Sequence, residues 1–397
     1  MIKVAFLYAT FPRPTETFVR RELRAFDQFN FSPDLYSIWK GSYSWENKTI
    51  HRFNITTLFR LIYWLPYWFF AKPRACKDVL FHLWSRPCHS LQNWCETFLG
   101  LGFALVEARS FKKKNYQLIH AVWATMPATA AFTISKLEAI EFSMGAHAYD
   151  VFRDGGDWLL GIKLAEAKFV RTSSASTEHR LSLLGVHPSK IKLVPRSISH
   201  RPIANDFQLR NSDTIELLSV GRLVEKKGYF HLLNIAFLLK KAGVLFHLKI
   251  VGDGPLRREL LVERDRLGLV RQVTFLGGLN QKEVQELYLG SDAFLFTGII
   301  DSKGDRDGIP NVVPEAMASG LLVLASDQAG APEAFQDKMS GFSLNPYNYP
   351  VWVSILCEFS KCPQQFVPIR ESAHRFVRQK FDSSENGRTL VKIFTDQ

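Results

Sequence analysis

The residues with the clearest chemical potential lie in the segment SVGRLVEKKG, at residues 219–228. Arg222, Lys226 and Lys227 stand here shortly after an apolar, strand-like run. In a parallel α/β sheet, anions bind beyond the carboxyl ends of strands. Arg222 offers a planar fork of donors and Lys227 a compact charge, which together suit a diphosphate, and Gly221 would let the chain turn at the strand end. A solvated basic turn explains the same residues equally well, so the segment alone leaves both interpretations open.

A second candidate is RDGIPNVVPEAMASG, residues 306–320, in which Asp307 and Glu315 flank a loop that contains Gly308. If a helix begins at Pro314 or Glu315, the Glu315 carboxylate lies near its first turn and can accept hydrogen bonds from vicinal hydroxyls such as a ribose diol. The alternative is that Glu315 only complements the helix dipole, which is the commoner role of such an acid. The spacing of the two acids does not decide between these roles.

The elements that must position these residues alternate along the chain. Short apolar runs such as IKVAFLY and QLIHAVWA alternate with helix-like segments such as TETFVRRELRAF, a pattern typical of βαβ units around a parallel sheet. A polar stretch, Ser199–Thr214, interrupts the pattern before it restarts. We therefore expect two doubly wound α/β domains with a linker between them.

Length and composition agree with two domains. The chain has 397 residues, of which 46% are hydrophobic, enough for two ordinary cores. Its five cysteines form neither a disulfide framework nor a C-x-x-C pattern, which favours a reducing compartment. The amino terminus reads as a first strand and not as a signal peptide, so we expect a cytoplasmic protein.

The net charge of +12 is concentrated in the amino-terminal half, where residues 1–200 hold 26 Lys and Arg against 15 Asp and Glu. Such a surplus bears on partners: nucleic acid, an acidic membrane surface or an anionic substrate. No recognisable nucleic-acid-binding module accompanies it, so we expect no nucleic acid partner.

The segment Thr56–Arg74 concentrates aromatic residues, among them Trp64 and Trp68. Four cations flank or end it: Arg52, Lys72, Arg74 and Lys77. It is too short and too interrupted to span a bilayer, which takes about 20 apolar residues. Rings with basic neighbours favour peripheral binding at an anionic membrane, while packing on the first domain's core is the alternative.

Several motifs together resemble the nucleotide-sugar domain of family 4 retaining glycosyltransferases with the GT-B fold. SVGRLVEKKG, KIVGDGPLRREL, VTFLGGL, EVQELYLGSDAFLF, DGIPNVVPEAMASGLLVLAS and AGAPEAF keep the family's order over about residues 214–335. In the amino-terminal half, FPRPTETFVRREL, HAVWATMPATAAF and MGAHAYDVFRD resemble the members that build bacterial exopolysaccharides, of the colanic-acid type.

The resemblance implies a GT-B fold, with two Rossmann-like domains whose parallel sheets face a central cleft. The expected domains are an acceptor domain over 1–200, a linker over 201–213 and a nucleotide-sugar domain over 214–369. A terminal helix, 370–397, would cross back to the amino-terminal domain.

The resemblance also implies the roles of the donor residues. Arg222 and Lys227 would bind the donor diphosphate and stabilise the leaving group, and Glu315 would bind the ribose. The family's paired glutamates appear here as Asp307 and Glu315, so the first acid is one methylene shorter and its reach to the donor sugar is reduced. The rest of the expected donor site comprises Gly221, Gly252, Leu279, Gly308, Ile309, Asn311 and Val312.

His147, in GAHAYD, matches the histidine near the reacting sugar carbon; without the motif, a lone histidine at a strand end is more often structural. Glu16 and Thr17, in the first βα connection, are candidate acceptor contacts, and helix capping by Glu16 is an equal alternative. The D-x-D at Asp305–Asp307 superficially matches a metal site of unrelated glycosyltransferases. Because two cations would already face the diphosphate, we expect no metal and no cofactor.

These inferences predict an enzyme: a retaining hexosyltransferase that moves a sugar from a UDP or GDP sugar to a glycan or lipid-linked saccharide acceptor in surface polysaccharide biosynthesis. The alternative is a nucleotide-sugar-binding protein whose active site has decayed, for which Asp307 is the sequence hint.

Overall fold

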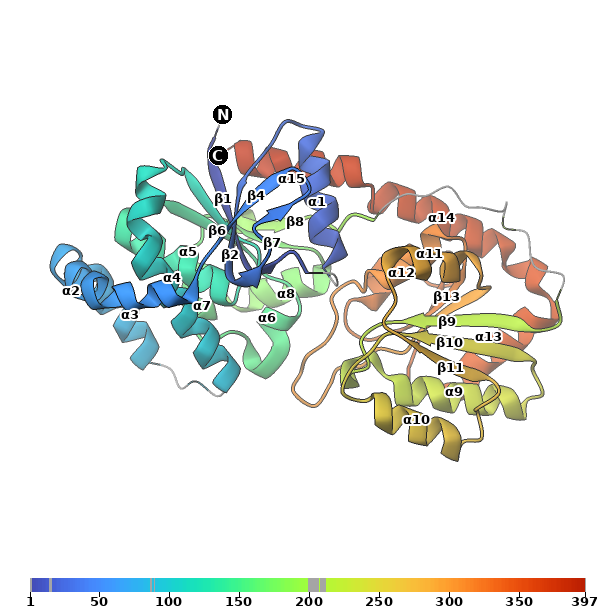
Figure 1. Cartoon of the computed structure of the whole chain (residues 1–397). Coiled ribbons are helices and arrows are strands. Elements are labelled where there is room, and N and C mark those ends of the chain that lie inside the picture. Colours follow the sequence, from blue (N-terminus) through green and yellow to red (C-terminus); the bar gives the residue numbers. More distant parts are fainter. Residues whose placement is uncertain are drawn as a thin grey trace. The chain divides into compact units, whose positions relative to one another are not determined.

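The computed structural model describes residues 2–13, 16–85, 88, 90–198, 207 and 212–396. The chain divides into two compact units, one formed by residues 1–195 and 384–397 and the other by residues 196–383 (Figure 1). Each unit is an α/β layered structure with its own sheet and its own buried core.

The first unit is built on an eight-stranded sheet in the order β3-β4-β2-β1-β5-β6-β7-β8. Neighbouring strands are parallel, apart from the antiparallel pair β3 and β4 at one edge. The central strand β1 is buried along most of its length, as expected for a parallel strand covered on both faces. The strands are β1 (Val4–Phe11), β2 (Asp34–Gly41), β3 (Ser44–Trp45), β4 (Lys48–Arg52), β5 (Leu118–Ala121), β6 (Glu141–Gly145), β7 (Val170–Thr172) and β8 (Ile191–Leu193).

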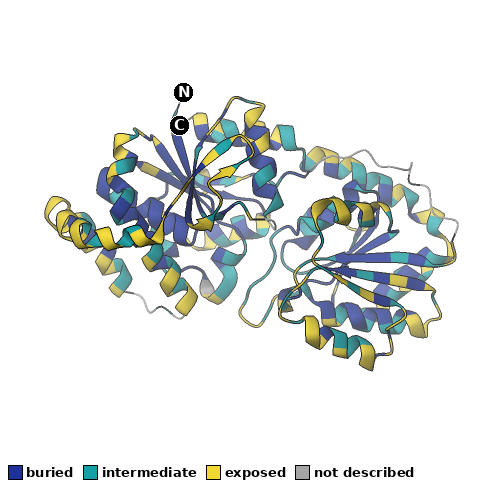
Figure 2. Ribbon diagram, in the orientation of Figure 1, coloured by how far each residue is buried: buried dark blue, intermediate teal, exposed yellow. Residues whose placement is uncertain are grey.

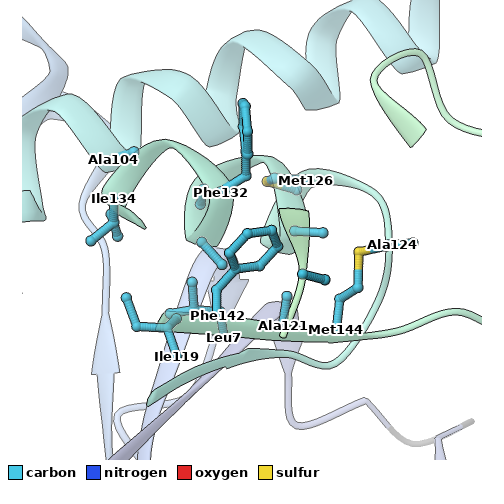
Figure 3. Close-up of a cluster of buried hydrophobic side chains, with 14 of the residues drawn as sticks. Leu7, Ala104, Ile119, Ala121, Ala124, Met126, Phe132, Ile134, Phe142 and Met144 are labelled. Carbon is cyan, nitrogen blue, oxygen red and sulfur yellow. The ribbon is translucent and has the colours of Figure 1, made fainter. Parts of the chain in front are cut away.

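Helices cover the sheet and enclose its main core. The long α4 packs on α5, and α5 packs on β1, β5 and β6. Figure 3 shows part of the resulting cluster, in which Phe132 of α5 and Phe142 of β6 are fully or almost fully buried. The helices are α1 (Thr17–Asp27), α2 (Leu61–Ala71), α3 (Pro73–Trp84), α4 (Leu91–Lys113), α5 (Met126–Glu138), α6 (Tyr149–Phe152), α7 (Leu160–Glu166), α8 (Ala175–Leu183) and α15 (Ser383–Thr395), with 3₁₀ turns η1 (Ile55–Arg60), η2 (Arg153–Gly155) and η3 (Pro188–Lys190).

The carboxyl-terminal helix α15 belongs to the first unit although it follows the whole of the second in sequence. Its Phe394 is 1% exposed and stacks on Phe31, with the ring centroids 5.8 Å apart. The same ring packs against Phe6 of β1 at 5.0 Å. At Gly387 a Cβ atom would approach the Ala25 side chain of α1 to 2.7 Å, so this close approach of α15 to α1 requires glycine. The helix therefore completes the core on one face of the sheet.

Helices α2 and α3 are largely exposed, and Figure 2 colours much of them accordingly. Trp68 is buried, as are Cys76 and Val79 of α3: Trp68 is 1% exposed, and its indole N–H donates to the Leu105 carbonyl over 2.8 Å. The prediction that Trp64 and Trp68 share a membrane-facing surface is therefore wrong for Trp68, because its ring belongs to the core. Within the described ranges, no helix combines the length and the apolar character that crossing a bilayer requires.

The second unit has a six-stranded parallel sheet in the order β11-β10-β9-β12-β13-β14. Relative to the unit's first strand this is the order 3-2-1-4-5-6 of the doubly wound dinucleotide-binding fold. The strands are β9 (Ile215–Val220), β10 (Phe246–Val251), β11 (Val273–Gly277), β12 (Ala293–Phe296), β13 (Leu322–Ser326) and β14 (Phe342–Leu344).

Helices complete the described part of the second unit. One of them, α11, begins with a capping box in which Asn280 and Glu283 satisfy each other's backbone N–H groups. The helices are α9 (Tyr229–Lys241), α10 (Arg257–Arg266), α11 (Gln281–Leu289), α12 (Val312–Ala318), α13 (Tyr349–Lys361) and α14 (Val367–Lys380), with 3₁₀ turns η4 (Glu225–Lys227), η5 (Ala331–Ala334) and η6 (Pro363–Phe366).

The unit boundaries differ from the expected ones at the carboxyl end. Ala373, Val377 and Phe381 are buried in a core cluster of the second unit, where α14 packs on α12. The segment returns to the first unit only from Ser384, rather than from Arg370. The apolar side chains of α14 explain this difference in boundary, because they pack into the core of the second unit. Most of the predicted linker, 201–213, lies outside the described residues.

Candidate functional site

Arg222, Lys227 and Asp307 follow the carboxyl ends of two neighbouring strands. In the second unit the strand order reverses between β9 and β12, so loops from these strands diverge there. Such a switch point is the usual ligand site of an open α/β sheet. Arg222 and Lys227 follow β9, and Asp307 lies in the long connection that follows β12. The sequence therefore brings both candidate segments to the same end of the sheet.

The turn that carries the lysines is fixed to the end of β12. Gly228 has φ +66°, and a Cβ atom there would lie 1.8 Å from the Thr297 carbonyl oxygen, so only glycine fits. The Thr297 hydroxyl donates to the Gly228 carbonyl over 2.9 Å, and the Ile299 N–H donates to the Lys226 carbonyl over 2.8 Å. These contacts hold Lys227 in a defined place beside the connection that contains Asp307.

Lys227 and Asp307 meet directly. The Lys227 Nζ donates to Asp307 Oδ2 over 2.7 Å, and it also lies 5.1 Å from the centroid of the Phe296 ring. Burial by itself would raise the pKa of Asp307, but Lys227 and Lys226 outweigh it and hold the pKa below its usual value. Arg222 lowers the same pKa further. Lys227 therefore bonds to this carboxylate and Lys226 lies 3.6 Å from it, while Arg222, an exposed residue, acts on it through its charge.

Lys226, beside Lys227, engages the other acid of the D-x-D sequence. Its side chain is 7% exposed, and its Nζ lies 3.0 Å from Asp305 and 3.6 Å from Asp307. Sequence reasoning counted Lys226 in the basic turn without giving it a role. Lys226 is buried, whereas Lys227 is only partly buried. The sequence KK does not show which of the two lysines is the buried one.

The glycines predicted for the site bring strand ends close together. Gly252, after β10, has φ +135°, and a Cβ atom there would lie 1.9 Å from the Gly221 carbonyl oxygen. That oxygen also accepts a hydrogen bond from the Tyr229 hydroxyl over 2.9 Å. Burial raises the pKa of Tyr229, so its hydroxyl stays protonated at neutral pH and remains a donor.

The remaining donor residues lie on the loops and on α12 near this point. Ile309 is buried in the core, and Gly308 backbone atoms lie near Gly330, while Asn311 is the N-cap of α12 and Val312 its first residue. Glu315 lies in the first turn of α12 and is partly exposed. Leu279, after β11, packs on the same core cluster as Ile309. The structure places all of them in the second unit, and their binding roles stay predictions.

His147 lies in the first unit, after β6, next to the strands β5 and β7 of its sheet. Its side chain is 3% exposed, and its ring lies edge-on to Trp123, which follows β5, at 5.1 Å between centroids. Its Nδ1 lies 3.4 Å from the Ser173 hydroxyl. The imidazole therefore has a fixed place at the carboxyl edge of the sheet.

Asp150 holds the His147 loop to the end of β5. Its two carboxylate oxygens accept the backbone N–H groups of His147 and Ala124, each over 2.8 Å. Burial raises the pKa of Asp150 to about 6, although the two N–H donors act in the opposite direction. Sequence reasoning missed Asp150 and Trp123. The available signal for Asp150 was an acid three residues after a strand-end histidine, a spacing that suits a side chain bonding to backbone N–H groups.

Glu16 and Thr17 begin α1, after the central strand β1. No side-chain hydrogen bond caps this helix among the residues described, so capping by Glu16, one of the two alternatives, is not observed. Glu16 instead lies 3.7 Å from Arg13. Phe18 of the same helix contacts Trp123, whose ring also contacts His147. The start of α1 and the histidine are thus linked through one aromatic ring within the first unit.

The chain is similar in sequence to known glycosyltransferases. Residues 201–380 match the family model described as glycosyl transferases group 1. AmsK of Erwinia amylovora, an amylovoran biosynthesis glycosyltransferase, is 28% identical over 231 residues, which are 58% of this chain and 54% of AmsK. WcaL of Salmonella typhimurium, which is named as a colanic acid biosynthesis glycosyltransferase, is 24% identical over 99% of both chains.

Solved structures show the same architecture over the whole chain. HepE of Anabaena, solved in complex with UDP, has a TM-score of 0.72 at 16% identity and covers 100% of both chains. Sucrose-phosphate synthase of Thermosynechococcus elongatus has a TM-score of 0.74 at 15% identity and covers 100% of this chain and 99% of its own. The two parallel-sheet units therefore form a GT-B fold, as the sequence predicted.

Proposed function

We propose that this chain, a glycosyltransferase whose residues 201–380 match the group 1 domain, transfers a sugar with retention of configuration from a nucleotide sugar to a saccharide acceptor in surface polysaccharide biosynthesis. The names of AmsK and WcaL support the pathway, and the complex of HepE with UDP supports the donor class. The observation that carries the proposal is that Arg222 and Lys227 both follow β9 at the switch point of the second sheet, where Lys227 meets Asp307.

The cations would act on the leaving group. Breaking the bond between the sugar and its phosphate leaves negative charge on the departing nucleoside diphosphate. Lys227 is held by its turn and pairs with Asp307, so in the donor complex a phosphate oxygen would take the place of that carboxylate or share the lysine with it. Losing one such donor typically lowers the rate about a hundredfold or more.

Glu315 would accept hydrogen bonds from the ribose, and the segment from Gly308 to Val312 would contact the donor sugar. Asp307 would act chiefly by orienting Lys227, since its carboxylate already engages that side chain. In the first unit, His147 would act next to the reacting carbon, while Glu16 and Thr17 would contact the acceptor. Gly221, Gly252 and Leu279 would shape the nucleotide pocket.

We further propose that transfer requires no metal ion. Asp305 and Asp307 are engaged by Lys226 and Lys227, so these carboxylates already have cationic partners. Activity in the presence of excess chelator tests this point: undiminished turnover is expected, and a loss restored by Mg²⁺ or Mn²⁺ would contradict it.

The proposed reaction is tested by incubating the protein with UDP and GDP sugars and a saccharide acceptor, and by reading the anomeric configuration of the product by NMR. An α-linked sugar donor should give an α-linked product. Inversion would refute retention. Tight nucleotide binding with no turnover for any donor would favour the decayed binding protein instead.

The proposed setting is the cytoplasmic face of the membrane, where the first unit would bind an anionic surface. Phe70 and Trp84, on α2 and α3, are 88% and 93% exposed. Sedimentation with anionic liposomes at low and high salt tests this attachment. Replacing Phe70 and Trp84 by serine should release a folded protein, whereas Val262→Ser, at an exposed site of α10, should not.

A further inference from the structure

We propose that an apolar cavity beneath α2 and α3 binds a hydrocarbon chain of a membrane lipid. The cavity has a volume of about 260 Å³ and is lined by side chains of α2, α3, α4 and α5, all in the first unit. The proposal rests on the membrane attachment proposed above, because the bilayer supplies such chains. It adds a specific site to that attachment.

The side chains that line the cavity offer a water molecule few hydrogen-bonding partners. Leucine, valine and aromatic side chains form most of it. The Thr133 hydroxyl, at its inner wall, donates to the Thr129 carbonyl over 2.8 Å, and the Trp68 indole donates to the Leu105 carbonyl over 2.8 Å. A buried water needs two to four polar partners, and cavities that lack them stay dry and accept apolar molecules. The chemistry of the walls therefore selects a hydrocarbon.

The volume suits a chain rather than a single small group. An apolar cavity of roughly 150 Å³ already takes benzene. In the same proportion, this cavity has room for about ten carbon atoms. That is a substantial part of an acyl or isoprenoid chain.

The cavity opens toward the most apolar surface of the unit. Leu65, Phe69, Leu80 and Phe98 line it and are also 40%, 45%, 49% and 41% exposed, so they form its mouth. A chain can therefore enter from outside without unfolding of the helices.

The cations and exposed rings around the cavity opening indicate that the bound hydrocarbon chain comes from a lipid surface. Residues 52–85 contain five Lys and Arg and a single acid, Asp78. Exposed aromatic rings among cations are what an interfacial segment presents to anionic headgroups. A protein partner would meet a surface rich in like charge, which the cores of protein interfaces avoid.

The test uses the full-length chain and dansyl-labelled undecanoic acid, kept below its micelle concentration. Binding is followed by dansyl emission. The wild type should bind saturably. Ala75→Phe places a ring in the cavity and should weaken binding at least tenfold, whereas Ala71→Phe adds the same ring at an exposed position outside the lining and should leave affinity unchanged.

A second variant guards against misfolding of the first. Leu80→Arg puts a charge at the exposed mouth and should weaken binding similarly, with circular dichroism and thermal unfolding as checks on both. Displacement of the probe by dodecanoate identifies acyl chains as the source, and displacement by farnesol alone identifies isoprenoid chains. Displacement by neither, or equal binding by all variants, would overturn the proposal.

Liposome sedimentation separates this proposal from the proposed function. Ala75→Phe should still sediment with anionic liposomes, because Phe70 and Trp84 remain. If the wild type binds the probe but no liposomes, the membrane attachment fails and the cavity site stands. If it binds liposomes but no probe, the cavity proposal alone fails.

Discussion

At the scale of single residues, the proposed chemistry depends on charges held in place by backbone contacts. Lys227 is fixed by Gly228 and the end of β12, and His147 by the carboxylate of Asp150. The Lys227 side chain also bonds to Asp307 and the His147 ring contacts Trp123, so both side chains have defined neighbours in the absence of substrate. Preorganised groups of this kind are effective in catalysis because they need little rearrangement as charge develops.

His147→Ala should lower kcat at least tenfold while changing donor affinity little. A group beside the reacting carbon acts mainly on the transition state, whereas diphosphate and ribose contacts already exist in the ground state. Steady-state kinetics and donor binding, measured on the same variant, check this. Unchanged kcat with a raised KM would remove His147 from its assigned role.

Asp150 should make the stability of the first unit depend on pH. Its pKa is raised to about 6 in the folded state, above the ordinary value, so the protonated form is favoured by folding. Its contribution to the free energy of unfolding is therefore greatest below the ordinary pKa of about 4 and is lost as the pH rises through 6, by up to a few kcal/mol.

Denaturant unfolding of the wild type and Asp150→Asn at several pH values measures this contribution. The stability of the wild type relative to the variant should fall between about pH 4 and 6. A difference that stays constant with pH would show that Asp150 does not titrate in this range.

At the scale of elements, α15 and α2 show how position in the fold decides what a helix contributes. Helix α15 supplies Leu390 and Phe394 to a core formed otherwise by the first 200 residues. Helix α2 presents exposed rings but buries Trp68. Substitution of an aromatic residue should therefore destabilise the first unit where the ring is buried and have little effect where it is exposed.

Phe394→Ala should destabilise the first unit by about 3–5 kcal/mol, the usual effect of emptying a buried aromatic site. Hydrogen exchange shows which unit is destabilised: the protection of β1 should fall, while β9 in the second unit stays protected. Trp68→Ser should likewise destabilise the first unit. Phe70→Ser, at an exposed ring of the same helix, should change unfolding little, and a large loss there would contradict the burial pattern.

The helices and strands could be predicted from the sequence more accurately than the packing of their side chains. The βαβ alternation and the glycine-bounded cationic turn were sufficient to place Arg222 and Lys227 after a strand of a parallel sheet. Composition could not separate Trp68 from its exposed neighbours, because a helix rich in aromatic residues all round gives no periodic signal for its buried side. The point at which the chain returns to the first unit was predicted too early, at Arg370, for a related reason. The apolar side chains of α14 do not show by themselves which of the two cores they join.

At the scale of the whole molecule, the two units divide the expected roles. The second unit holds every predicted donor residue, and the first holds His147, Glu16, Thr17 and the aromatic helices. Because α15 completes the first core, removal of residues 383–397 should lower the stability of the first unit while nucleotide binding by the second persists. Calorimetric unfolding with and without UDP checks this, since a bound ligand stabilises only the unit that holds it.

The central claim is that Arg222 and Lys227 bind the diphosphate of the donor, and isothermal titration with UDP and GDP tests it most directly. The wild type should bind at least one of them. Lys227→Ala and Arg222→Ala should each weaken that binding about tenfold or more, as expected for lost charged hydrogen bonds. Lys241→Ala, which removes the same charge at the far end of α9, should bind as the wild type does. Equal affinity in all four proteins would contradict the claim.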